Sequence, residues 1–170
     1  ADELIDLVLR VMIDPGDTVF NFPPTFGMYA FGARLNGARL VEIPRRDDFS
    51  LNMMDILEQA QALHPKVIFL TSPNNPTGTY WNEQKLRRFL DRVDGQQIVV
   101  VDEAYAEFVE AEDFPNSMTM INEYPNLVVF RTFSKMFALV ALRVGYLVGH
   151  EKIVDIIRRT CVVYSVNTLA

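Results

Sequence analysis

The sequence predicts an α/β fold with three layers, in which a mostly parallel sheet has helices on both faces. Short apolar runs, at 67–70 and 98–101, are typical of strands that are buried on both sides. Segments with apolar residues at helical spacing alternate with such runs along the chain. Loops rich in Pro, Gly and Asn separate the two kinds of segment. This alternation is typical of βαβ units, which build parallel sheets.

The first half of the chain begins with apolar residues at helical spacing from Leu4 to Met12, and the turn at 14–17 ends that helix. A strand is expected at 18–21, a helix at 26–36 that Gly37 ends, and a strand at 39–43. Ser50 is predicted to cap a helix over about 51–63.

The second half continues the alternation, with a strand at 67–70 and a loop at 72–78. Asn82 is expected to cap a helix that runs to about Val93. The remaining expected elements are strands at 98–101, 127–130 and 144–148 and a helix at 151–159.

Composition limits the class of protein. The 170 residues carry a net charge of −6, which argues against a surface that binds nucleic acid. No apolar run is long enough to cross a membrane, because Arg143 interrupts the longest candidate, 137–149. The single cysteine, Cys161, cannot form an internal disulfide, and this fits a reducing compartment such as the cytoplasm. The abrupt ends, at Ala1 and Ala170, suggest part of a longer protein.

Candidate site residues follow the expected strands. In open parallel sheets, ligands bind beyond the carboxyl ends of the strands, so polar side chains at these ends are expected to meet in one crevice. The four segments concerned contain Phe26, Asn75, Asp102 with Tyr105, and Ser134 with Lys135.

Other site classes find no support in the sequence. Neither a dinucleotide-binding glycine motif nor a phosphate-binding P-loop motif occurs. The two histidines, His64 and His150, are isolated, and no residues have the spacing of metal ligands. We therefore predict no metal site.

Together the motifs resemble those of the class I/II aminotransferases of fold type I, which depend on pyridoxal 5'-phosphate. The resemblance rests on Ser-Pro-Asn-Asn-Pro-Thr-Gly at 72–78, Asp-Glu-Ala-Tyr at 102–105, Ser-Lys at 134–135 and Arg143, in that order. Each motif is weak alone, but four in order over nearly the whole chain are specific. A narrower likeness to the histidinol-phosphate branch rests on segments 23–29, 132–139, 142–146 and 164–167.

The resemblance implies roles for single residues. Lys135 would hold the cofactor aldehyde covalently and then move the substrate α-proton, and Asp102 would pair with the protonated pyridine nitrogen. Tyr105 and Asn75 would donate hydrogen bonds to the ring oxygen. Phe26 would stack on the ring.

The cofactor phosphate needs hydrogen-bond donors and positive charge. The resemblance assigns it to the guanidinium of Arg143, the hydroxyl groups of Thr132 and Ser134, and the backbone N–H groups of Ala1 and Asp2. The substrate side would include Tyr164 and Asn167. The family usually has glycine where this chain has Ala141, a difference that matters if the backbone there needs a positive φ.

The function expected from the resemblance is transamination of L-histidinol phosphate with 2-oxoglutarate, in a homodimer. Residues 1–170 would form an incomplete cofactor-binding large domain, without the N-terminal segment and the C-terminal small domain. Three alternatives stay open. They are an aminotransferase for aromatic amino acids, a decarboxylase of an amino-alcohol phosphate on the same fold, and a truncated, non-catalytic binding or dimerisation module.

Overall fold

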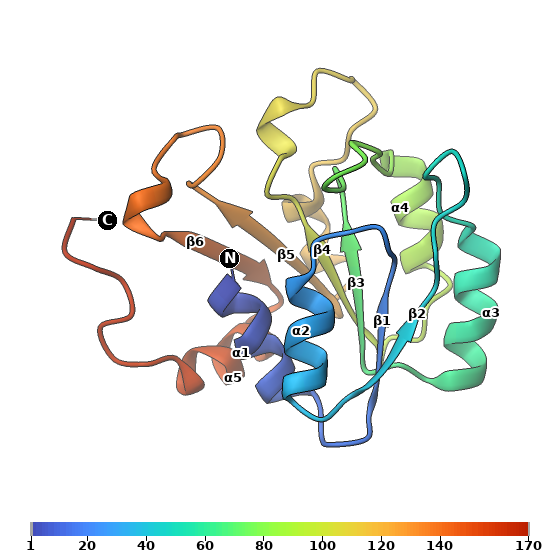
Figure 1. Cartoon of the computed structure of the whole chain (residues 1–170), viewed down its shortest axis with the longest axis horizontal. Coiled ribbons are helices and arrows are strands. Elements are labelled where there is room, and N and C mark those ends of the chain that lie inside the picture. Colours follow the sequence, from blue (N-terminus) through green and yellow to red (C-terminus); the bar gives the residue numbers. More distant parts are fainter. Residues whose placement is uncertain (1, 170) are drawn as a thin grey trace.

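A computed structural model describes residues 2–169 and places six strands in one sheet of order β2-β1-β3-β4-β5-β6 (Figure 1). The strands are β1 (Thr18–Asn21), β2 (Arg39–Glu42), β3 (Val67–Thr71), β4 (Ile98–Asp102), β5 (Leu127–Thr132) and β6 (Gly145–Gly149). The α-helices are α1 (Asp2–Met12), α2 (Met28–Leu35), α3 (Met53–Leu63), α4 (Glu83–Leu90) and α5 (Glu151–Thr160).

Strands β1 to β5 pair in parallel, and β6 pairs with β5 in the antiparallel direction. The register aligns Thr71 of β3 with Asp102 of β4, and Asp102 with Phe130 of β5. Because these strands are parallel and in register, their carboxyl ends open on the same edge, the upper edge of the sheet in Figure 1.

Helices cover both faces of the sheet, which confirms the three-layer α/β prediction. One hydrophobic cluster combines α1, α2 and α5 with one face, and another combines α3 and α4 with the other face. Strand β3 shows how the residues divide: Val67 and Phe69 join the first cluster, whereas Ile68 and Leu70 join the second. Alternate side chains of a strand point to opposite faces, so a strand buried on both faces reads as a continuous apolar run.

The start of α3 differs from the prediction. The helix begins at Met53 and its N-cap residue is Asn52, whose side chain makes no capping hydrogen bond, so the predicted cap at Ser50 is wrong. Ser50 instead donates its backbone N–H to the carboxylate of Asp48 in the preceding turn. Asn82 is the N-cap of α4, as predicted, and accepts a hydrogen bond from the backbone N–H of Lys85 at 2.9 Å.

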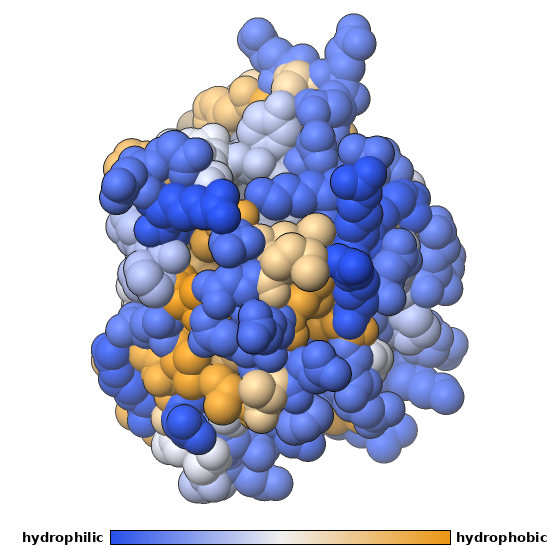
Figure 2. Space-filling model, turned by 90° about the vertical axis from the view of Figure 1, so that its right-hand side faces the viewer, coloured by the Kyte–Doolittle hydropathy of each residue, from blue (hydrophilic) through white to orange (hydrophobic). Residues whose placement is uncertain are grey.

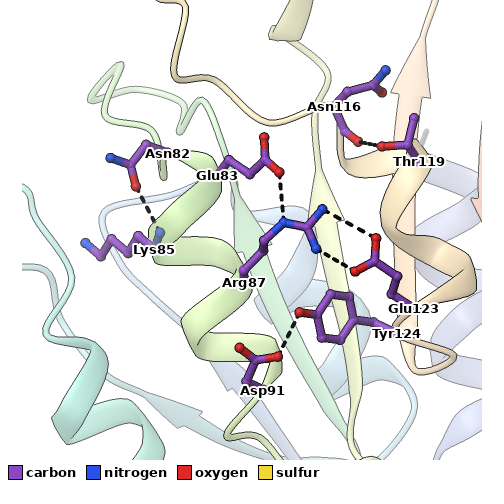
Figure 3. Close-up of polar contacts among 9 residues, drawn as sticks. All are labelled: Asn82, Glu83, Lys85, Arg87, Asp91, Asn116, Thr119, Glu123 and Tyr124. Carbon is purple, nitrogen blue, oxygen red and sulfur yellow. Dashed lines mark hydrogen bonds and ion pairs between the residues drawn. The ribbon is translucent and has the colours of Figure 1, made fainter.

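Ion pairs and hydrogen bonds join α4 to the segment that precedes β5 (Figure 3). Arg87 contacts Glu83 at 2.8 Å and Glu123 at 2.7 Å, and the hydroxyl of Tyr124 donates to Asp91 at 2.8 Å. These contacts join α4 to the two residues that follow the 3₁₀ helix Ser117–Asn122.

The side of the molecule formed by α3 and α4 is mostly hydrophilic, with islands of hydrophobic residues between charged ones (Figure 2). No helix among residues 2–169 has the length and apolar character needed to cross a membrane.

Candidate active site

A cavity of about 100 Å³ lies at the carboxyl edge of the sheet. Strands β3, β4 and β5 each end at it, and the first residue of α1 also reaches it. The predicted cofactor residues that line this cavity are Asp2, Phe26, Asn75, Asp102, Tyr105, Thr132, Ser134, Lys135 and Arg143. Ala1, the remaining predicted residue, lies outside the described part of the chain. The cavity thus gathers side chains from segments far apart in the sequence.

Asp102 is the last residue of β4 and is 4% exposed. Its Oδ2 accepts a hydrogen bond from the phenol of Tyr29 at 2.7 Å, and its Oδ1 accepts one from the backbone N–H of Ala104 at 3.1 Å. Burial raises the pKa of the Asp102 carboxyl, and the two hydrogen bonds oppose this rise because they favour the charged form. A cation brought next to Asp102 would therefore be favoured, since it would offset the cost of burying the carboxylate.

Tyr29, on α2, was not identified from the sequence. It is fully buried and stacks on Phe69, with ring centroids 4.8 Å apart. Burial raises the pKa of its phenol well above the usual value, so the group stays protonated and donates to Asp102. The hydroxyl of Thr71 in turn donates to the Tyr29 oxygen at 3.0 Å. The three residues form one chain of hydrogen bonds that ends on the Asp102 carboxylate.

The signal for Tyr29 was its spacing from Phe26. Phe26 lies just before α2, which begins at Met28, so Tyr29 in the first turn of that helix stands next to a ring that faces the site. The two rings lie edge to face with centroids 5.7 Å apart, and both line the cavity.

Lys135 lies in the loop that follows β5, with its ammonium 5.4 Å from the centre of the Tyr105 ring. The hydroxyl of Thr132 accepts a hydrogen bond from the backbone N–H of Ser134 at 3.1 Å, which holds the start of this loop. The end of β5 and this loop thus place an amine and two hydroxyl groups at the cavity, next to the Tyr105 phenol from the segment after β4.

Asn75 reaches the cavity from the loop after β3, and its neighbour Asn74 anchors that loop. The Asn74 side chain donates to the carbonyl of Pro24 at 3.0 Å and accepts from the hydroxyl of Thr25 at 2.6 Å. Gly78, at the end of the loop, has a φ of 71°. This conformation favours glycine, which accounts for its place in the motif.

Arg143 and Asp2 meet at one end of the cavity, where the guanidinium lies 2.9 Å from the Asp2 carboxylate. Both side chains are largely exposed, so the pair itself adds little stability. Positive φ angles in this region occur at Ala138 (53°) and Arg143 (52°) and not at Ala141, which lies in the 3₁₀ helix Val140–Leu142. The alanine therefore needs no left-handed backbone.

The two residues expected on the substrate side do not line this cavity. Tyr164 is 96% exposed, and Asn167 donates a hydrogen bond to the carbonyl of Leu142 at 2.7 Å. Asn167 thus contacts the 3₁₀ helix next to Arg143, whereas Tyr164 projects into solvent. Among residues 2–169, no three His, Cys, Asp or Glu side chains are arranged to hold a metal ion.

The solved structures to which this fold is similar include aminotransferases. The histidinol-phosphate aminotransferase of Sinorhizobium meliloti, solved in complex with pyridoxal-5'-phosphate, matches with a TM-score of 0.87 and 24% identity over 94% of this chain and 43% of that one. The aromatic aminotransferase of Pyrococcus horikoshii matches with a TM-score of 0.80 and 26% identity over 93% of this chain and 43% of that one.

Sequence relatives point the same way. The chloroplastic histidinol-phosphate aminotransferase of Nicotiana tabacum is 44% identical over 100% of this chain and 40% of its own length. The histidinol-phosphate aminotransferase of Anoxybacillus flavithermus is 38% identical over 100% of this chain and 45% of its own length. The chain thus spans less than half the length of these relatives. The family profile "Aminotransferase class I and II" matches residues 1–168. The chain belongs to the class I and II aminotransferase family.

Proposed function

We propose that the protein containing this chain is a pyridoxal-phosphate-dependent aminotransferase that converts L-histidinol phosphate and 2-oxoglutarate to imidazole-acetol phosphate and glutamate. The observation that carries this proposal is the single cavity that combines Lys135, Asp102, Asn75 and Arg143. The choice of amino donor rests on relatives that are named histidinol-phosphate aminotransferases at 38–45% identity.

The chemistry of the cavity fits such a cofactor group by group. An amine can react with the cofactor aldehyde, and a buried carboxylate can pair with a protonated ring nitrogen. An arginine with two neighbouring hydroxyl groups suits a phosphate. When bound, the cofactor supplies an electron sink for the electrons released at the substrate α-carbon. Asp102, Lys135 and Arg143 are the residues that we assign to these three contacts.

Lys135 has two tasks in this proposal. Its Nζ would hold the cofactor aldehyde, and as a free amine Lys135 would be the base that moves the proton of the substrate α-carbon. Tyr105 lies beside this amine and, together with Asn75, would donate hydrogen bonds to the ring oxygen. Phe26 would pack against the ring face.

The phosphate end would be held by Arg143, by the hydroxyls of Thr132 and Ser134, and by the N-terminus of α1 at Asp2. Arg143 is paired with the Asp2 carboxylate at 2.9 Å. A bound phosphate would replace Asp2 as the partner of this guanidinium. Ala1 is part of the same proposal, as are Tyr164 and Asn167 on the substrate side.

Three further points concern the whole protein. We propose that the chain is the cofactor-binding large domain and that the complete protein also has a small domain, as the longer relatives allow. A homodimer is proposed because exposed apolar residues gather at 136–140 and 162–169. A cytoplasmic location is proposed from the single free cysteine. The plant relatives are named chloroplastic, so a plant parent would place the reaction there.

A titration of the chain with pyridoxal phosphate tests the cofactor assignment. We expect a visible absorption band from the lysine-bound cofactor in the wild type, and none in Lys135→Ala, because Lys135 is the only lysine among residues 2–169 that lines the cavity. Lys152→Ala, which changes an exposed lysine of α5, is the matched control and should keep the band. Equal bands in all three proteins would favour the non-catalytic module.

A transamination assay of the complete parent protein tests the substrate. We expect L-histidinol phosphate to give the highest kcat/KM with 2-oxoglutarate as acceptor. A higher kcat/KM for aromatic amino acids would replace the proposed donor, and release of CO₂ from an amino-alcohol phosphate precursor would indicate a decarboxylase. In both cases the cofactor assignment would stand.

A further inference from the structure

Arg45, in the segment after β2, is a buried charge without a counter-ion. It is 9% exposed. Its Nε donates to the carbonyl of Phe22, and its Nη1 donates to the carbonyl of Phe49 and the hydroxyl of Thr79, each at 3.2 Å. Its Nη2 is buried and has no partner. No carboxylate among residues 2–169 forms an ion pair with it. Buried charges are normally paired with an opposite charge, and this guanidinium has no such partner.

A second cation lies beside it. The Lys85 ammonium is 4.7 Å from the centre of the Trp81 ring and donates one hydrogen bond, to the carbonyl of Leu51 at 3.4 Å. Its side chain points away from the ion pairs of Arg87 (Figure 3). Burial and the positive charges of Arg45 and Arg46 lower the pKa of Lys85, and only the exposed Asp48 opposes this.

Both cations line one cavity of about 400 Å³ between the segment after β2 and the start of α4. The residues of its wall include Arg45, Thr77, Thr79, Tyr80, Trp81 and Lys85. None of its lining residues lines the cavity that contains Lys135. The hydroxyls of Thr77 and Thr79 lie 2.9 Å apart on this wall and can reorient toward a ligand.

We propose that this cavity binds a small free oxyanion, carrying a phosphate or carboxylate group, that pairs with Arg45 and Lys85. Such a group supplies the missing negative charge, and it accepts hydrogen bonds from the lysine ammonium and the threonine hydroxyls. A purely structural role, in which Arg45 ties three loops together, accounts for its Nε and Nη1 bonds. It accounts neither for the missing counter-ion of Arg45 nor for a second cation on the same wall.

The test uses Trp81, the single tryptophan of the chain, as its probe. The chain is titrated with inorganic phosphate and, separately, with succinate, each against sodium chloride of equal ionic strength. We expect a saturable change in tryptophan fluorescence with at least one oxyanion and none with chloride, because Lys85 lies over the indole ring. The oxyanion that binds more tightly identifies whether a phosphate or a carboxylate is preferred.

Variants locate the binding site. Lys85→Gln should weaken binding about tenfold or more, as expected for loss of a charge-assisted hydrogen bond. Lys66→Gln removes the same charge from an exposed residue outside the cavity and should leave binding unchanged. Arg143→Gln should leave the Trp81 response unchanged, because Arg143 lines the other cavity and Trp81 does not. Arg45→Met should abolish binding if the variant folds, and Lys85→Gln decides the matter if it does not.

Three outcomes would overturn the proposal: no saturable response in the wild type, equal affinity in Lys85→Gln, or a response that disappears with Arg143→Gln. The last outcome would assign the ion to the cofactor cavity. None of these results depends on aminotransferase activity, so the proposed function and this proposal can fail separately.

Discussion

At the scale of residues, the site depends on how a buried carboxylate is held. Asp102 would be costly to bury alone, and the Tyr29 phenol offsets part of that cost at 2.7 Å. Thr71 donates to the same phenol oxygen, so the Tyr29 proton is directed toward Asp102. The sequence motifs identified the carboxylate, whereas no role was assigned to the Tyr29 phenol and the Thr71 hydroxyl that support it.

Removal of the Tyr29 hydroxyl should therefore destabilise the chain. Tyr29→Phe keeps the stacking on Phe69 but leaves a buried carboxylate oxygen with one donor fewer. We expect the free energy of unfolding to fall by about 1.5–3 kcal/mol, measured by urea denaturation. Tyr80→Phe, which removes an exposed hydroxyl bonded to Asp113, should cost less than about 1 kcal/mol. Similar small losses in both variants would contradict this account.

Asp102 should also make stability depend on pH. Burial raises its pKa in the folded state above the unfolded value of about 3.9, so the folded chain holds a proton that the unfolded chain releases. The contribution of Asp102 to stability is therefore present at low pH and is lost as the pH rises through the folded-state pKa. Asp102→Asn has no titratable group at this position, so its stability lacks this dependence on pH.

Urea denaturation of both proteins at several pH values above about 4 measures this effect. The stability of Asp102→Asn relative to the wild type should rise with pH until Asp102 is fully ionised. Parallel stability curves for the two proteins would show that the Asp102 pKa is not raised.

At the scale of elements, the structure contains most of the helices and strands that hydrophobic periodicity predicted. Strands β3, β4 and β5 lie where continuous apolar runs placed them, because a strand with helices on both faces has no polar side. The direction of β6 was not predicted. The connection from β5 to β6 contains only the 3₁₀ helix Val140–Leu142 and no α-helix, whereas a parallel return usually passes through an α-helix.

Helix caps were harder to predict than helices, because a cap depends on the conformation of one residue. The sequence offered suitable polar residues before both α3 and α4, but only Asn82 makes the capping bond. Asn82→Ala should lower the free energy of unfolding by about 1 kcal/mol. Asn52→Ala, at the uncapped position before α3, should change it little. Equal losses in both variants, measured by urea denaturation, would refute this distinction.

At the scale of the whole molecule, the exposed apolar residues indicate a missing contact. Val162, Val163 and Val166 are 64–73% exposed and lie close together in the sequence after α5. Apolar residues gathered on a surface favour association with another protein surface. This exposure could not be predicted from sequence, since apolar periodicity indicates burial without saying whether the partner is the same chain.

The chain should therefore self-associate. We expect sedimentation velocity to show a mass that rises with concentration, and a variant with Val162, Val163 and Val166 all changed to Asp to remain monomeric. Met54→Asp, at an exposed apolar residue of α3, is the control and should associate like the wild type. A monomeric wild type at all concentrations, or association that survives the triple change, would contradict the proposed interface.

The candidate cavity was largely predictable because the family motifs occupy strand ends, and parallel strands bring their ends to one edge. Tyr29 was not identified because it lies on a helix, and Thr71 because it falls between the predicted strand 67–70 and the loop 72–78. The cavity lined by Arg45 and Lys85 was not predicted, because an arginine in a loop is expected to be solvated unless its burial is known.

The central claim is that Lys135 is the amine that holds the cofactor. The most direct measurement incubates the chain with pyridoxal phosphate, reduces it with borohydride and maps the modified peptide by mass spectrometry. The account predicts a single stable modification at Lys135, whose ammonium lies beside Tyr105 in the cavity. Modification spread over exposed lysines such as Lys66 and Lys152, with Lys135 no more labelled than these, would contradict it.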